Sequence, residues 1–238
     1  MRGVFYLILL SLAVFIIFNC NSSKQSGITP EKIYFAQATP DTSRYERGIN
    51  AIPERDAVFI EWVPVHDESI QHIRLYRSEE REGPYRLIGT AARSDTSYID
   101  ETVLVDVRYF YYAIAESRDG VASASSDTIH YTLLEKAVGI MPIGDIYTPV
   151  PEFSWENPNS PPEHAYMLRL QEAVSEKWIW NVRIPTSYSE FNHDIFNSDS
   201  NALVDSLVKN TEYRWRVDIL GSQPFTGSKS QWRSFIIR

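Results

Sequence analysis

Hydrophobic and polar side chains alternate along much of this chain, and a period of two predicts β-strands. In the segment AVFIEW, Val58, Ile60 and Trp62 fall on one face. Turn residues separate such segments, and Asp119-Gly120 is a typical hairpin turn. The first half of the chain carries no helical period. Short strands with frequent turns favour an all-β sandwich.

One segment occurs twice, at residues 103–115 (VLVDVRYFYYAIA) and 207–219 (LVKNTEYRWRVDI). In each copy an aliphatic residue stands six positions before a tyrosine, Tyr109 or Tyr213, and an aromatic residue follows two positions later. A buried tyrosine at the start of a strand, with its hydroxyl bonded to backbone just upstream, is a tyrosine corner. We therefore predict two corners and two sandwiches.

The length of 238 residues and the repeat distance of about 100 residues indicate two small domains. We place them at residues 33–133 and 139–238. A hydrophobic content of 43% and an aromatic content of 13% are enough for two packed cores.

The first repeat resembles a fibronectin type III domain along nearly its whole length. The resemblance rests on Trp62 and on the segments IRLYRSEEREGPYRLIG, DTSYIDETVLVDVRYFYYAIAE and DGVASASS. It implies structural roles for these residues, with Trp62 in the core and Tyr109 at the corner. Some members of the family bind integrins through Arg-Gly-Asp before the last strand. This chain has Arg118-Asp119-Gly120, in a different order, so we expect only a hairpin turn.

The second repeat resembles fibronectin type III or immunoglobulin-like sandwiches more loosely, with Trp155 in the place of Trp62. The distance from tryptophan to corner tyrosine is 47 residues in the first repeat and 58 in the second. The additional residues lie within residues 171–202. We expect an all-β protein with two tandem fibronectin type III-like sandwiches after a signal peptide and a short tether.

The N-terminus carries an apolar run of 15 residues, 4–18, after Arg2. This length is shorter than the roughly 20 residues of a spanning helix and suits the apolar region of a signal peptide. The run ends in Ile-Phe-Asn-Cys20, which resembles the lipobox of bacterial lipoproteins. An uncleaved signal anchor with an incidental cysteine is the alternative.

The lipobox resemblance implies that residues 1–19 are removed and that Cys20 receives acyl chains such as palmitate, which anchor the protein in the membrane. Residues 20–32 then form a lipidated flexible tether. Asn21 takes the place of the aspartate that causes inner-membrane retention in similar lipoproteins, which favours the outer membrane. We therefore expect a lipid-anchored protein of the cell envelope.

Charge and residue spacing argue against several classes of function. The net charge is -8 and is dispersed, with no basic run for nucleic acid. The five histidines show no metal-site spacing, and no nucleophile motif is present, so we expect no enzyme, metal or cofactor. Asn197, Asp199 and Asn201 have calcium-loop spacing. However, Ala202 and Val208 replace the glycine and the closing glutamate, which favours a solvated loop.

The two repeats differ on their outward faces. If Tyr109 and Tyr111 face the core, then Phe110, Tyr112 and Ile114 face outward, and alternation places Tyr76 of the neighbouring strand beside them. We call Tyr76, Phe110, Tyr112 and Ile114 the aromatic face.

The matching positions of the second repeat are Arg214, Arg216 and Asp218, which predict a solvated face. An apolar patch such as the aromatic face marks a contact surface. Either a partner covers it, or residues 33–35 or the second domain do.

Two hypotheses of function follow. The first is a non-enzymatic envelope lipoprotein that acts as a binding or scaffolding module for an unidentified protein partner. The alternative is an accessory or spacer subunit of a carbohydrate-active or secretion machine. In that case Trp178 or Trp180 would stack on sugar rings, which requires exposed indoles.

Overall fold

The structure is a computed structural model that describes residues 28–40, 43–156, 165–185 and 191–238. Within these residues every regular element is a strand, and the strands form two β-sandwiches, so the predicted fold class is confirmed. The signal peptide, Cys20 and most of the tether lie outside the described residues. No helix in the described part of the chain is long and apolar enough to cross a membrane.

The first sandwich has a smaller and a larger antiparallel sheet. The smaller sheet consists of β1 (Asn50–Ala51), β2 (Val58–Glu61) and β5 (Ser97–Asp100). The larger sheet consists of β4 (Arg86–Ala92), β3 (Ile70–Ser78), β6 (Arg108–Ser117) and β7 (Ile129–Leu133). Val58 and Ile60 of β2 pack against Tyr109 and Tyr111 of β6, which closes the core between the sheets.

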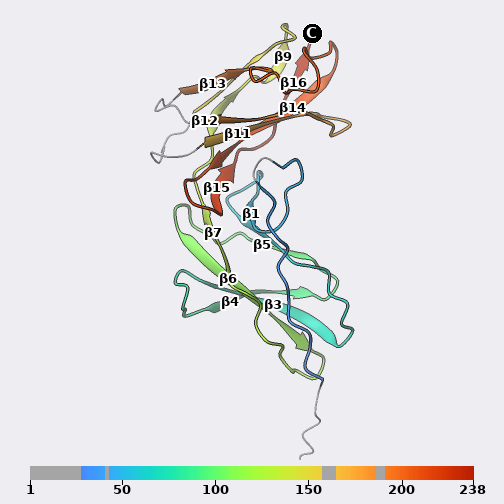
Figure 1. Ribbon diagram of the computed structural model, residues 1–238, viewed down its shortest axis with the longest axis vertical. Helices are drawn as coiled ribbons and strands as arrows, with labels where there is room; N and C mark the ends of the chain where they lie inside the picture. Colours follow the sequence, from blue (N-terminus) through green and yellow to red (C-terminus); the bar gives the residue numbers. More distant parts are fainter. Residues whose placement is uncertain (1–27, 41–42, 157–164, 186–190) are drawn as a thin grey trace, which may run out of the picture.

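The segment before β1 contributes to the first sandwich. Ile33 is buried in its core, and Phe35 forms an antiparallel bridge with the buried Trp62. Figure 1 shows this segment running the length of the first sandwich up to the second one.

The second sandwich repeats this plan with a longer middle. Its smaller sheet consists of β8 (Val138–Met141), β10 (Glu152–Glu156) and β13 (Phe191–Ile195). The larger sheet consists of β12 (Trp178–Pro185), β11 (Ala165–Glu172), β14 (Glu212–Leu220), β15 (Thr226–Lys229), β16 (Arg233–Ile237) and β9 (Gly144–Ile146). Trp155, Leu168 and Trp215 lie in one buried cluster between the sheets.

The larger sheets of the two sandwiches are continuous. β7 pairs in parallel with β15, and Thr132 N–H donates to the Phe225 carbonyl at 2.9 Å. Leu134 N–H donates to the Gly227 carbonyl at 3.0 Å. Backbone hydrogen bonds therefore join the two halves end to end, and Figure 1 shows β7 and β15 beside each other at this point.

The two predicted tyrosine corners differ. In the second sandwich the Tyr213 hydroxyl accepts a hydrogen bond from Val208 N–H at 3.0 Å, as predicted. In the first sandwich Tyr109 is buried, but its hydroxyl forms no hydrogen bond with the described residues, so this half of the prediction is wrong. The Arg77 guanidinium lies 4.4 Å from the centre of the Tyr109 ring instead. Tyr111, two positions on, bonds to the buried Asp100 at 3.2 Å.

A β-bulge in β12 changes which tryptophan enters the core. Trp178 and Trp180 share one face if the strand alternates regularly. In the structure Leu170 pairs with Trp180 and Gln171 pairs with Trp178, so Ile179 is an additional residue. A bulge of one residue reverses the side on which the following positions lie. Trp180 is therefore buried, and Trp178 lies on the opposite face of the sheet.

Candidate binding surfaces at the aromatic face and the junction

The aromatic face lies on β6 and β3 of the first sandwich. β6 alternates strictly, with Phe110, Tyr112 and Ile114 half-buried between fully buried neighbours. The register of β3 and β6 pairs Tyr76 with Tyr112. Their rings stack, with the ring centroids 4.9 Å apart. A stacked pair of this kind contributes about 0.5–1.5 kcal/mol beyond the burial of its area.

Two further residues belong to this surface that the alternation pattern did not identify. The Tyr85 ring meets Tyr112 edge-on with centroids 4.8 Å apart. Leu87 of β4 pairs with Tyr76 and is 50% exposed. Tyr85 precedes β4, and a bulge in β3–β4 pairing follows Leu87, so simple alternation cannot place either residue. We call Tyr76, Tyr85, Leu87 and Tyr112 the tyrosine cluster.

The other two predicted residues lie to either side of the cluster. Phe110 contacts His130, and His130 meets Phe225 of the second sandwich edge-on at 5.3 Å. Burial and the nearby Arg108 lower the pKa of His130. Ile114 pairs with Arg74, which forms an ion pair with Glu116. The second sandwich thus contacts the Phe110 end of the aromatic face through His130.

Residues 33–35 do not cover the aromatic face. Ile33 and Phe35 pack into the core of the first sandwich, and Tyr34 is exposed. In the described residues, the N-terminal segment instead reaches the junction between the sandwiches. The tyrosine cluster is left half-buried on the sheet surface.

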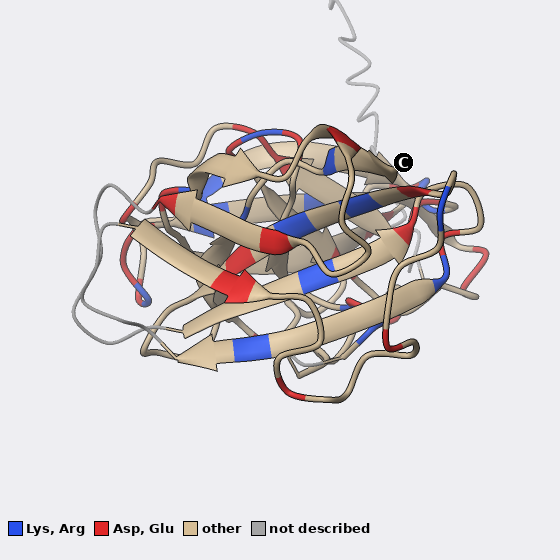
Figure 2. Cartoon of the chain, turned by 90° about the horizontal axis from the view of Figure 1, so that it is seen from above, with Lys and Arg blue, Asp and Glu red and all other residues tan. Residues whose placement is uncertain are grey.

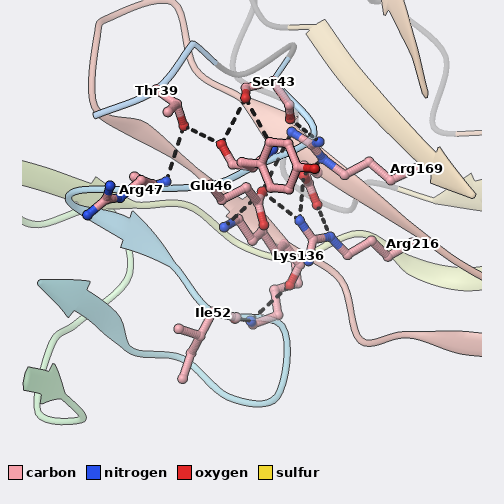
Figure 3. A network of polar contacts seen from close by, with 11 residues as sticks. Thr39, Ser43, Glu46, Arg47, Ile52, Lys136, Arg169 and Arg216 are labelled. Carbon is pink, nitrogen blue, oxygen red and sulfur yellow. Dashed lines mark hydrogen bonds and ion pairs between the residues drawn. The ribbon is translucent and has the colours of Figure 1, made fainter. Parts of the chain in front are cut away.

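The corresponding face of the second sandwich is closed, which corrects the expectation of a solvated surface. Arg214 is half-buried, but Arg216 and Asp218 are each 3% exposed. Glu46 of the N-terminal segment covers them, with its Oε1 2.6 Å from Arg216 Nη2 (Figure 3). Buried charges are stable only when they are paired, and here each charge has its partner.

The covering network extends across β11, β14 and β15. Arg169 Nε donates to Asp218 Oδ2 at 2.6 Å, and Arg169 Nη1 donates to the Ser43 carbonyl at 2.7 Å (Figure 3). Lys229 Nζ lies 3.0 Å from Glu46 Oε1. Burial alone would raise the pKa of Glu46, but Arg216, Lys229 and Arg169 outweigh it and hold the pKa at about 2. Glu46 is therefore charged at neutral pH.

Lys136 bridges the two sandwiches. Its Nζ donates to the Ile52 carbonyl of the first sandwich at 2.6 Å and to the Lys229 carbonyl of the second at 2.9 Å. Burial lowers the pKa of Lys136 to about 8. Together with the β7–β15 pairing, this contact fixes the junction on two sides.

The candidate glycan-binding tryptophans have different surroundings. Trp180 is buried, and its Nε1 donates to Asp199 at 2.8 Å. Trp178 is half-buried, with its ring near Arg169 and 6.3 Å from that of Trp232. Trp180 therefore cannot stack on a sugar.

The loop with calcium-like spacing is held by its own hydrogen bonds. Asp199 accepts from Trp180 and from Asn201, so its carboxylate supports the core. Among the described residues, no group of three or more His, Cys, Asp or Glu side chains is placed to hold a metal ion. Gly120 N–H donates to the Ser117 carbonyl with a φ of 76°, which makes Arg118-Asp119-Gly120 part of a tight turn.

Sequence comparison finds no matching family model and no matching curated protein. Among solved structures, the FN1–FN3 domains of chicken CNTN1 are 13% identical, with a TM-score of 0.39, and the match covers 89% of this chain and 69% of that one. A two-domain fibronectin type III segment of chicken tenascin is 15% identical, with a TM-score of 0.33, over 88% and 98% of the two chains.

A β-1,2-glucanase from Parabacteroides distasonis is 20% identical, with a TM-score of 0.34, and the match covers 45% of this chain. The chain spans only 13% of that enzyme. All three scores are too low to carry function across. The fibronectin type III-like fold therefore rests on the chain's own strand pairing and its sandwich cores.

Proposed function

We propose that this chain is a non-enzymatic binding or scaffolding module of the cell envelope, anchored through a lipid on Cys20 in the outer membrane. The tyrosine cluster would contact a protein partner. The observation that carries this proposal is the contrast between the two repeats. The chain covers the outward face of the second sandwich with Glu46, whereas it leaves the tyrosine cluster half-buried.

The nature of the surface supports a protein partner. Tyrosine combines a large apolar ring with a hydroxyl, and protein interfaces are enriched in it. Lys and Arg are interspersed with Asp and Glu on the strands in Figure 2, which does not favour a nucleic-acid backbone. The joined sheets and the Lys136 contacts would present the cluster at a constant position relative to the second sandwich.

The binding proposal predicts that Tyr112→Ser removes a partner without unfolding the protein. We expect the loss of a band in a pull-down from detergent-solubilised envelope with the tether intact. The free energy of unfolding should fall by only about 1–3 kcal/mol, because the ring contacts of Tyr112 with Tyr76 and Tyr85 are lost.

Tyr147→Ser is the matched control, since Tyr147 is 79% exposed on the second sandwich. An unchanged set of partners for Tyr112→Ser would contradict the proposal. So would the same loss with Tyr147→Ser.

The anchoring proposal predicts that Cys20→Ala abolishes lipidation. Metabolic labelling with a palmitate analogue should mark the wild-type protein and leave the variant unmarked, because Cys20 is the single cysteine of the chain. Equal labelling of both forms, or a mature N-terminus upstream of residue 20, would reject it.

The alternative of an accessory or spacer subunit with glycan binding has less support. Of its two candidate tryptophans, only Trp178 is partly accessible. A spacer role without glycan contact remains compatible with the joined sheets and would leave the Tyr112→Ser pull-down unchanged.

A further inference from the structure

A pocket of about 350 Å³ opens beside the tyrosine cluster, at the end of the β3–β4 hairpin. Arg77 and Tyr109 line it together with Tyr85, which also belongs to the tyrosine cluster. Its remaining lining residues come from the hairpin: Ser78, Glu79, Glu80, Pro84 and Arg86.

Arg77 is 1% exposed, and of its three side-chain nitrogens only Nη1 forms hydrogen bonds with the described residues. Its Nη1 donates to Asp100 Oδ2 at 2.6 Å and to Thr102 Oγ1 at 2.9 Å. Its Nε and Nη2 form no hydrogen bond with the described residues. The stacked Tyr109 ring and the Asp100 carboxylate hold the guanidinium plane in place. The Nε–Nη2 edge is therefore held in a fixed orientation beside the pocket and has no acceptor among the described residues.

The Tyr109 hydroxyl is a second unused group in the same pocket. It corresponds to the Tyr213 hydroxyl, which accepts a backbone hydrogen bond in the second sandwich. In the first sandwich that bond is absent from the described residues. Arg77 and Tyr109 both line this pocket, so one ligand that enters it can accept hydrogen bonds from both unused groups.

The geometry of these groups selects the ligand. Two parallel N–H bonds from one edge of a guanidinium match the two oxygens of a carboxylate. Asp100 cannot serve, because each of its oxygens already accepts two hydrogen bonds. Oδ1 accepts from the Thr102 N–H and hydroxyl, and Oδ2 accepts from Arg77 Nη1 and the Tyr111 hydroxyl. Glu79 and Glu80 at the rim are exposed, so solvent and salt screen their charges far more than that of Arg77.

We propose that this pocket binds a carboxylate of the partner protein, either an Asp or Glu side chain or a carboxy terminus. The carboxylate accepts from Arg77 Nε and Nη2 and from the Tyr109 hydroxyl, while neighbouring apolar groups of the partner lie on Tyr85 and Tyr112. This inference deepens the proposed protein-binding function and rests on it for the identity of the partner.

Acetate tests the pocket directly, with acetamide as the neutral probe of the same shape. In the full chain in detergent, acetate should shift the NMR signal of the Arg77 Nε–H group saturably, and acetamide should not. Tyr109→Phe should weaken acetate binding about tenfold, the effect of one hydrogen bond to a charged group. Its midpoint of thermal unfolding should stay unchanged, because the hydroxyl has no partner among the residues that the structure describes.

Tyr213→Phe is the matched control. It should lower the midpoint of unfolding by about 2–8 °C through the lost corner bond and leave acetate binding unchanged. An Arg77 signal that moves no more in acetate than in chloride would overturn the carboxylate site. If Tyr109→Phe loses as much stability as Tyr213→Phe, the carboxylate site is overturned as well.

The acetate titration and the Tyr112→Ser pull-down together show whether the carboxylate site or the protein-binding function is wrong. If acetate does not bind but Tyr112→Ser still loses the partner, only the carboxylate site is wrong. If acetate binds and no partner depends on Tyr112, only the protein-binding function is wrong. A peptide with a free carboxy terminus and an amidated peptide containing Asp then distinguish the two sources. If neither peptide binds, the proposal that the carboxylate comes from a protein is overturned.

Discussion

Glu46→Gln is expected to lower the free energy of unfolding by about 3 kcal/mol at pH 7, which corresponds to the lowered pKa of this carboxyl group. Glu46 Oε1 contacts Arg216 and Lys229, both nearly fully buried. A neutral amide leaves these cations without the charge that compensates their burial. Urea unfolding of the full chain measures the loss.

The pH dependence of this effect follows from the direction of the pKa shift. The pKa of Glu46 is about 2 in the folded protein and 4.5 ordinarily. A lowered pKa means that the charged carboxylate stabilises the fold above about pH 4.5. This contribution falls as pH drops towards 2, where folded Glu46 also takes up a proton. The difference between wild type and Glu46→Gln should therefore narrow between pH 4.5 and 2.

Glu176→Gln is the matched control for Glu46→Gln. Glu176 forms an ion pair with Arg214, but its side chain is 67% exposed. Exposed ion pairs contribute below about 1 kcal/mol, so this variant should be close to wild type. Equal losses for the two variants would mean that the junction network does not hold the sandwiches together.

Trp180→Ala is expected to cost about 3–5 kcal/mol in stability, the range for removal of a large buried ring. Trp180 packs against Phe153 and Phe196, and its indole N–H donates to Asp199. Urea unfolding of the full chain measures this loss.

Trp178→Ala is the comparison that tests the bulge at Ile179. Trp178 lies half-buried on the opposite face, beside Arg169 and Trp232, so its removal should cost about 1 kcal/mol. Equal costs for the two variants would mean that Trp178 and Trp180 share a face, and that the register of β12 is wrong.

Equivalent outward positions of the two repeats carry different side chains and have different surroundings. On β6 the outward positions carry Phe110 and Tyr112, and on β14 they carry Arg216 and Asp218. The N-terminal segment of the chain buries Arg216 and Asp218, whereas Phe110 and Tyr112 are only half-buried. The face that looked solvated in sequence thus became part of the junction, and the binding proposal rests on the other face.

Local patterns were sufficient for the strands and for much of the two cores. Alternation identified β2 and β6, and the repeated corner segment identified two sandwiches, because a strand presents every second side chain to the same side. The same rule correctly separated Tyr109 and Tyr111 from Phe110 and Tyr112. Trp62 and Trp155 could be assigned to the cores because each is a large apolar ring on an alternating strand.

Tertiary structure alone decided what covers each face and how each polar group is paired. Arg216 is buried by Glu46, which lies 170 residues earlier in the chain. The bulge at Ile179 moved Trp178 out of the core. Arg77 pairs with Asp100 and stacks on the Tyr109 ring, and Tyr109 lines a pocket. A period of two tells which side chains share a face. It holds no information about the distant segment that comes to lie on that face, because that contact depends on how the whole chain folds back on itself.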